Sequence, residues 1–189
     1  MRQRLLIFIS IVLFSCNKNE SNESIEILKA KFHGKYEMIS SFSSEPVDLN
    51  MDSNSSINLL SENKEILDAG LVLMVLDEGN ILFEEKWPVE YIGLPKGEIF
   101  DSTSYHSSYT INYANYINSA MCQFDENYKS IKLVSELYQN STNKLIEIES
   151  ISFEKNEIIK VITIRKLYTI NGWTKTKIVS QYKRFTIDT

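Results

Sequence analysis

The sequence from Gly70 to the C-terminus is a nearly continuous series of strand signals separated by short turns. Residues 71–76 and 81–85 are two strand-like runs joined by Asp77-Glu78-Gly79-Asn80, where glycine accepts a positive φ at little cost. Asn171-Gly172 is the strongest short turn signal, because both residues accept the positive φ of a type I′ hairpin. Consecutive strands with hairpin-length connections predict an antiparallel meander that closes as a barrel or a sandwich.

The other predicted elements complete this all-β chain. Trp87-Pro88 is expected to end the first hairpin, and residues 89–97 contain several bends. Short helices are expected at residues 24–32, with Ser24 as N-cap, and at residues 56–67. Further strands are predicted at residues 36–42, 105–117, 120–124, 130–137, 145–153, 157–170 and 173–187. We therefore predict one domain, residues 24–189, with an up-and-down barrel of about eight to ten strands and a short N-terminal helix.

Residues 1–16 are typical of an export signal. Arg2 and Arg4 precede an apolar run, residues 5–14, that is too short to remain as a membrane-spanning helix. The run ends in Leu13-Phe14-Ser15-Cys16, which resembles the lipobox of bacterial lipoproteins. The resemblance implies removal of residues 1–15, lipidation of Cys16 and a membrane anchor in the cell envelope, at the outer rather than the inner membrane. The alternative is an ordinary signal peptide that contains a cysteine.

The polar segment after Cys16 and the scattered charges of the chain limit which partners the protein can bind. Residues 17–23 are polar and are expected to form a flexible tether. The chain carries a formal charge of -5 that is scattered along it, so we expect no nucleic acid partner and no basic patch for anionic lipids. Cys122 is the only other cysteine, and its apolar neighbours predict a small buried hydrophobe rather than a reactive thiol.

Two short motifs point to a family. Gly34-Lys35-Tyr36 opens the first predicted strand, and Tyr182-Lys183-Arg184-Phe185 lies near the end of the last one. A short helix, this Gly-x-aromatic motif and a meander with this ending resemble the lipocalin-like lipoproteins of Gram-negative bacteria. Lipocalins have tryptophan at the position of Tyr36, over which an arginine packs, and Arg184 is the candidate for that arginine, since an aromatic face also accepts a guanidinium.

The resemblance implies a barrel closed by the pair of Tyr36 and Arg184. It also implies a cup that holds a small apolar or amphipathic ligand or is filled by side chains, and it implies no reaction. From the residues, Tyr105, Tyr109 and Tyr113 share one parity of a predicted strand. Together with Trp87 they are the candidate ligand pocket, because aromatic faces stack and hydroxyl groups form hydrogen bonds. The alternative is that these large residues fill the core.

A segment with alternating oxygen-bearing side chains is the candidate metal site. Asp48, Asn50, Asp52 and Asn54 have the spacing of the first half of an EF-hand calcium loop. Ser53 stands where that loop needs glycine, and the bidentate glutamate position is Leu59. An Asx-rich turn that binds its own backbone explains the same residues. Calcium binding is the alternative, and no other cofactor is expected.

Catalytic motifs are absent from the sequence. It contains no Gly-x-Ser-x-Gly, His-Glu-x-x-His or Cys-x-x-Cys motif and no phosphate-binding glycine loop. The strand glutamates Glu84, Glu85, Glu147 and Glu149 are expected on a solvated face. The alternative is that they pair as acid and base in a cleft, as in a hydrolase that acts on glycans. We therefore expect a protein that is not an enzyme and that binds a small ligand. The alternative is an interaction module whose loops, residues 44–66 and 93–104, bind another envelope protein.

Overall fold

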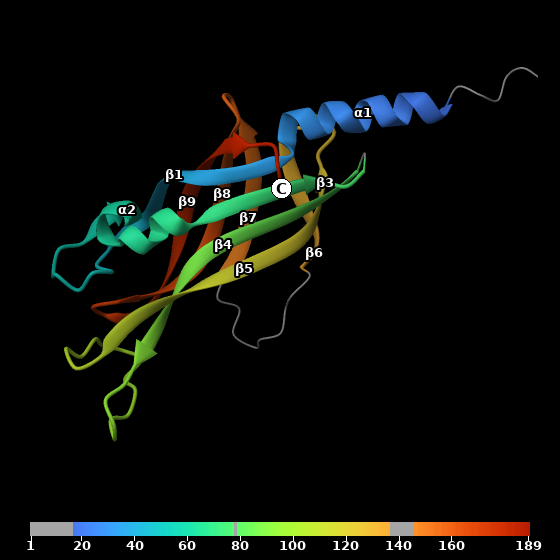
Figure 1. The fold of residues 1–189 in the computed structure, drawn as a ribbon. Coiled ribbons are helices and arrows are strands. Elements are labelled where there is room, and N and C mark those ends of the chain that lie inside the picture. The colour runs from blue at the N-terminus through green and yellow to red at the C-terminus, as the bar shows by residue number, and fades with distance from the viewer. Residues whose placement is uncertain (1–16, 78, 137–145) are drawn as a thin grey trace, which may run out of the picture.

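The computed structural model describes residues 17–77, 79–136 and 146–189 of the chain. The described residues form nine strands, joined in one antiparallel sheet in the order β2-β1-β3-β4-β5-β6-β7-β8-β9. The first and last strands of the meander, β1 and β9, also pair, and this closes eight of the strands into a barrel (Figure 1). The predicted all-β, lipocalin-like barrel is confirmed.

The strands differ widely in length. They are β1 (Gly34–Val47), β2 (Ser56–Asn58), β3 (Gly70–Val75), β4 (Asn80–Gly93), β5 (Thr110–Phe124), β6 (Ser130–Glu136), β7 (Ile146–Glu154), β8 (Ile158–Thr169) and β9 (Gly172–Thr186). The helical elements are α1 (Asn17–Phe32), α2 (Leu59–Glu62) and the short 3₁₀ helix η1 (Lys64–Asp68).

The N-terminal helix is longer than predicted. Helix α1 begins at Asn17 rather than at Ser24, so the prediction of a tether over residues 17–23 is wrong for the backbone of that segment. A helix that already exists gains one hydrogen bond for each residue it adds, so polar residues extend it without burying a face. Helix α1 lies at one end of the barrel and projects away from it (Figure 1). Cys16 and residues 1–15 lie outside the described residues, and no described helix has the length and apolarity needed to span a bilayer.

Strands β4 and β5 form a longer hairpin than the sequence indicates. Their pairing runs without interruption from Asn80 opposite Gln123 to Gly93 opposite Thr110, so the predicted break at Trp87-Pro88 is wrong. The pairing of β4 with β3 ends at Lys86, and beyond it that edge of β4 has no described strand partner. Proline lacks the N–H of a ladder and is tolerated at such an unpaired edge, which explains why the strand continues.

Two further local predictions, the helix at residues 56–67 and the type I′ turn between the last two strands, are wrong. The predicted helix at residues 56–67 is divided into β2, α2 and η1, because Asn58 and Asn63 each cap a new turn through their side chains. A turn does join β8 and β9 here, but it consists of Ile170 and Asn171, between the paired residues Thr169 and Gly172, and of these residues only Gly172 has a positive φ (77°). The turn is therefore not of type I′, which requires two positive φ angles.

Glycine at position 34 allows the start of β1 to lie very close to the end of β9. Gly34 has a φ of 143°, and a Cβ atom there would collide with the backbone carbonyl oxygen of Thr186 on β9. The backbone of the first motif thus approaches the end of the last strand more closely than any other residue type permits.

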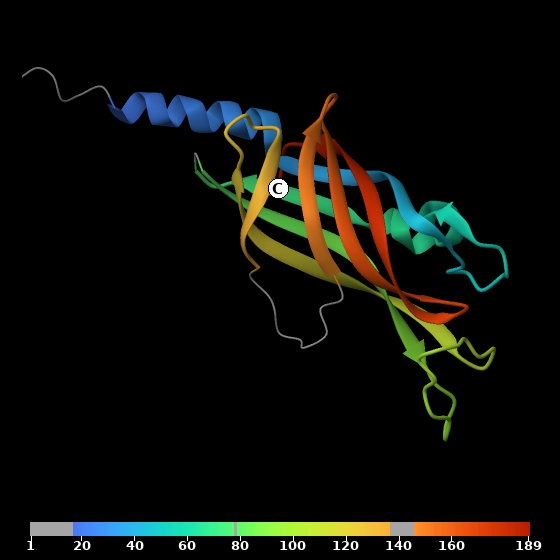
Figure 2. The ribbon, with the colours of Figure 1, turned by 180° about the vertical axis from the view of Figure 1, so that it is seen from behind.

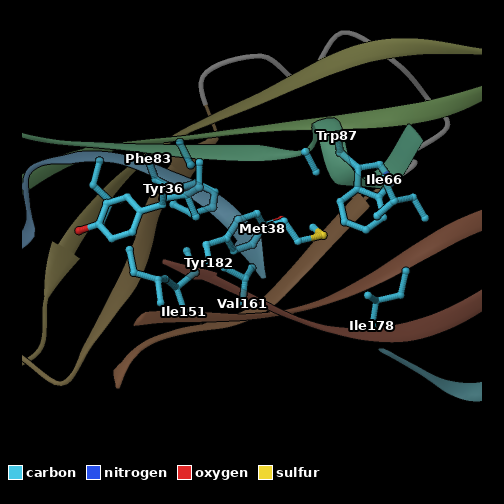
Figure 3. Close-up of a cluster of buried hydrophobic side chains, with 14 of the residues drawn as sticks. Tyr36, Met38, Ile66, Phe83, Trp87, Ile151, Val161, Ile178 and Tyr182 are labelled. Carbon is cyan, nitrogen blue, oxygen red and sulfur yellow. The ribbon is translucent and has the colours of Figure 1, made fainter. Parts of the chain in front are cut away.

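The interior of the barrel is filled by side chains. Large residues from strands on opposite sides of the barrel meet in its centre, as Figure 3 shows for Tyr36, Phe83, Trp87, Val161 and Tyr182. The small cavity beside Trp87 measures about 20 Å³, which is room for about one water molecule.

Candidate functional site

The candidate site is a hollow of about 650 Å³ at the end of the barrel where α1 meets β1, which we call the mouth cleft. Its walls are the C-terminal end of α1, the β5–β6 turn and the β7–β8 turn, which lie together at this end of the molecule (Figure 2). The residues that line it include Lys31, Phe32, Tyr36, Tyr128, Lys129, Phe153, Glu154, Lys155, Glu157 and Arg184.

Aromatic rings form the apolar side of the cleft. Phe32, the last residue of α1, is buried, and its ring centroid lies 4.3 Å from that of Phe153 and 4.9 Å from that of Phe124. Phe124 in turn contacts Tyr128 at 5.3 Å between centroids. Tilted aromatic pairs of this kind stabilise each other beyond the area they bury. Phe32, Tyr128 and Phe153, which line the cleft, are called the aromatic floor below.

Arg184 fixes the shape of the cleft. Its Nη1 donates to the carbonyl oxygens of Ala30 (2.9 Å) and His33 (3.2 Å) at the end of α1, where the helix dipole favours a cation. Its Nη2 forms an ion pair with the carboxylate of Glu157, and its backbone N–H donates to the carbonyl oxygen of the same residue (3.1 Å). Arg184 therefore ties α1 and the β7–β8 turn to β9.

The structure brings Tyr36 and Arg184 together as direct partners in the ladder that closes the barrel. Tyr36 is buried, its hydroxyl donates to the carbonyl oxygen of Phe32 (2.6 Å), and burial raises the pKa of the phenol to about 12. The described cation–π contacts do not include this pair. The guanidinium is instead directed to the end of α1 and to Glu157.

A polar network lies inside the barrel. Nη2 of Arg165 on β8 is 2.6 Å from Oε2 of Glu85 on β4, and the hydroxyl of Tyr182 donates to Oε1 of Glu85 (2.7 Å). Nε of Arg165 donates to Thr163 (3.0 Å), and its guanidinium lies 3.9 Å from the ring of Trp87. The expectation that Glu85 is solvated is therefore wrong. The network is sealed from solvent, so it is not placed to act on a substrate.

The four residues predicted as a ligand pocket do not surround one cavity in the part of the chain that is described. Tyr105 and Tyr109 precede β5, so the predicted strand parity fails. The hydroxyl of Tyr109 contacts the backbone of Asp101 and Ile99 in its own loop. Tyr113 lies on β5, opposite Glu90. Trp87 is buried in the core against Arg165 rather than at a strand end.

Glu90 is the carboxylate that lines the small cavity. It lines that cavity with Arg165 and Trp87, and burial raises the pKa of its carboxyl group to about 7. The backbone N–H of Tyr168 and the charge of Arg165 act in the opposite direction but do not cancel the effect. Burial and the neighbouring Glu90 raise the pKa of Tyr113.

The predicted calcium segment is an Asx-rich turn. The carboxylate of Asp48 accepts the backbone N–H groups of Asp52 (3.2 Å) and Ser53 (2.8 Å). The side chain of Asn50 accepts from the N–H of Asp52, and that of Asp52 accepts from the N–H of Asn54. Within residues 17–77, 79–136 and 146–189, no group of three or more His, Cys, Asp or Glu side chains is placed to hold a metal ion.

The fold and the cleft define the class of protein: a closed antiparallel β-barrel with a filled interior and a hollow at the mouth beneath a terminal helix. Comparisons of the chain with protein-family models, with curated proteins and with solved structures find no match. The mouth cleft could not be predicted from the sequence, because its lysines, at positions 31, 129 and 155, are far apart in the chain and come together only in the fold. The only local signal was the aromatic residue at the predicted end of α1, Phe32.

Proposed function

We propose that this protein is a lipid-anchored lipoprotein of the cell envelope that binds a small amphipathic ligand in the mouth cleft and catalyses no reaction. The observation that carries the proposal is the cleft itself. Its volume of about 650 Å³ lies within the usual range of small-molecule sites. Such sites combine apolar walls with a few polar groups, and here the aromatic floor lies beside lysine and arginine side chains.

The position of α1 supports the link between anchor and cleft. The helix starts directly after Cys16 and has 16 residues, which gives a length of about 24 Å. Its far end contributes Lys31 and Phe32 to the cleft. A lipid on Cys16 therefore keeps the cleft within a few nanometres of a bilayer, where amphipathic molecules are concentrated.

Ligand binding is tested by native mass spectrometry of residues 17–189, which contain every described element, purified without detergent. We expect a one-to-one complex with an added single-chain amphiphile. Phe153→Ala, which removes a ring of the aromatic floor, should weaken it. Phe100→Ala removes a partly exposed ring that does not line the cleft and serves as the matched control. A bare mass with every amphiphile, or equal loss in both variants, would contradict the proposal.

Anchoring is tested separately in a Gram-negative host that is supplied with labelled palmitate. The wild-type chain should incorporate the label and fractionate with membranes. Cys16→Ser should do neither, whereas Cys122→Ser, which changes the other cysteine, should behave as the wild type. Label that persists in Cys16→Ser would rule out this anchor.

A second candidate function, a protein interaction module, is favoured by a groove on the outer face of the barrel. The groove measures about 420 Å³ and contains three apolar side chains that are more than half exposed, those of Leu67, Ile117 and Phe185. Exposed apolar groups gathered in this way are typical of interaction surfaces. A photo-crosslinker at Ile117 should then give one specific adduct in cells, which Phe185→Asp removes. The same crosslinker at Leu76, which is exposed outside the groove, is the control.

A further inference from the structure

Some of the charged side chains that line the mouth cleft have partners within the protein, and others form no salt bridge with any residue that the structure describes. Both carboxylates are occupied: Glu157 pairs with Arg184, and Glu154 accepts a hydrogen bond from the side-chain amide of Gln181 (2.8 Å). The guanidinium of Arg184 is occupied by its bonds to Glu157 and to the end of α1. Glu157 and Arg184 are therefore already paired with each other, whereas Glu154 keeps its negative charge.

The other cationic groups that line the cleft are the ammonium groups of three lysines. In the described part of the chain, no salt bridge joins Lys31, Lys129 or Lys155 to a carboxylate. The ammonium of Lys31 lies 4.9 Å from the centroid of the Phe32 ring, so it is held beside the aromatic floor. The cleft is thus cationic in a protein whose formal charge is -5.

The other two lysines come from neighbouring turns. Lys129 ends the β5–β6 turn, and its carbonyl oxygen accepts the backbone N–H of Phe153 (2.8 Å). Lys155 lies two residues after Phe153, in the β7–β8 turn. This hydrogen bond holds the two turns side by side, and Lys129 and Lys155 both line the cleft. Like charges that line one cleft repel each other, and an anion bound between them relieves the repulsion.

We propose, on the basis of the function above, that the mouth cleft selects single-chain amphiphiles with an anionic head group, a carboxylate or a phosphate. Lys129 and Lys155, the turn lysines, bind the head group. The alkyl chain lies on the aromatic floor, which excludes water from it. The ligand enters as a monomer from solution and not as part of a bilayer surface.

The test compares ligands that share a chain and differ in charge. The probes are dodecanoate, dodecyl phosphate, dodecyl maltoside and dodecyltrimethylammonium, each kept below its critical micelle concentration. Binding to residues 17–189 is measured by calorimetry at neutral pH and low salt. The variant Lys129→Gln/Lys155→Gln removes the turn lysines. Lys64→Gln/Lys96→Gln removes two exposed lysines that do not line the cleft and changes the net charge equally.

We expect the two anionic probes to bind and the cationic probe to fail. The turn-lysine variant should lose at least about tenfold in affinity for the anionic probes, because each lost ammonium removes a charge-assisted hydrogen bond. The matched control should stay near the wild type. Added salt should weaken anionic binding in the wild type more than in the turn-lysine variant.

Three other results would overturn the inference in distinguishable ways. Equal affinity for neutral and anionic probes, unchanged in the turn-lysine variant, would reject the head-group assignment and leave amphiphile binding in place. Failure of every probe would reject the proposed function as well. Binding to phosphatidylglycerol vesicles without binding to the monomeric anionic probes would assign the lysines to a membrane surface instead.

Discussion

Arg165 and Glu85 form an ion pair across the interior of the barrel, with side chains that are 1% and 0% exposed. They belong to β8 and β4, which are not neighbours in the sheet. Ionised groups removed from water each cost several kcal/mol, which their attraction offsets only while both partners are present. Tyr182 and Thr163 add hydrogen bonds to the same two side chains. Each ion is therefore tolerated in the core only because the other is there.

Removing one member of this pair should destabilise the barrel strongly. We expect Glu85→Gln and Arg165→Met each to lower the free energy of unfolding by about 3–5 kcal/mol, since a buried charge is left without its partner. The measurement is urea unfolding followed by circular dichroism. Glu149→Gln breaks the more exposed pair with Lys177 and should cost less than about 1 kcal/mol.

The corresponding double variant separates the pair from its surroundings. Glu85→Gln/Arg165→Met should recover much of the stability that either single change loses, because no uncompensated charge remains. If the losses simply add, the two residues contribute independently and the account of the pair is wrong.

The raised pKa of Glu90 should make stability depend on pH near neutrality. Burial raises this pKa to about 7 in the folded protein, above the ordinary value of 4.5. Between these values the folded state binds more protons than the unfolded state, so stability should fall as pH rises from about 4.5 to about 7 and then level off. Glu90→Gln should remove this contribution.

The contribution is measured as the difference in unfolding free energy between wild type and Glu90→Gln at each pH. This difference cancels other groups, such as His33, whose pKa is lowered by burial and by the charge of Lys29 and which acts in the opposite direction. Glu126→Gln, at an exposed turn position, should leave the slope of the wild type intact. A pH-independent difference would show that Glu90 does not titrate in this range.

Gly34→Ala should destabilise the closure of the barrel. The new methyl group would meet the backbone carbonyl oxygen of Thr186 and would also force a φ of 143° on a residue with a Cβ. We expect a loss of at least about 1 kcal/mol by the same unfolding measurement. Gly70→Ala is the control, because there the nearest backbone atom, the carbonyl oxygen of Tyr36, lies at an ordinary 3.5 Å. Equal effects of the two changes would argue against a specific role for Gly34.

Local signals were sufficient for the fold and insufficient for the site. Alternating apolar residues and turn residues such as Asn171-Gly172 act over a few positions, so strands and hairpins are visible in the sequence. The neighbours Glu84 and Glu85 are chemically identical, and only the closure of the barrel decides that one faces Arg165 in the core. Likewise, the turn lysines line the same cleft because strand pairing brings their turns together, and not because of sequence spacing.

Cys122 should be inert in the native protein and reactive in the unfolded chain. Its side chain is fully buried on β5, and burial raises the pKa of the thiol to about 12, so almost no reactive thiolate is present at neutral pH. In a Cys16→Ser background this is the only thiol. Labelling by maleimide should therefore be negligible in buffer and should become rapid at the urea concentration where the barrel unfolds.

The control for this prediction is Ser135→Cys, which places a thiol at an exposed position on β6 and should react at once in the native state. The ratio of the two native rates reports how rarely Cys122 is uncovered. Rapid labelling of Cys122 well below the unfolding transition would show that β5 separates from its neighbours β4 and β6 without global unfolding. The barrel would then have a locally opening wall.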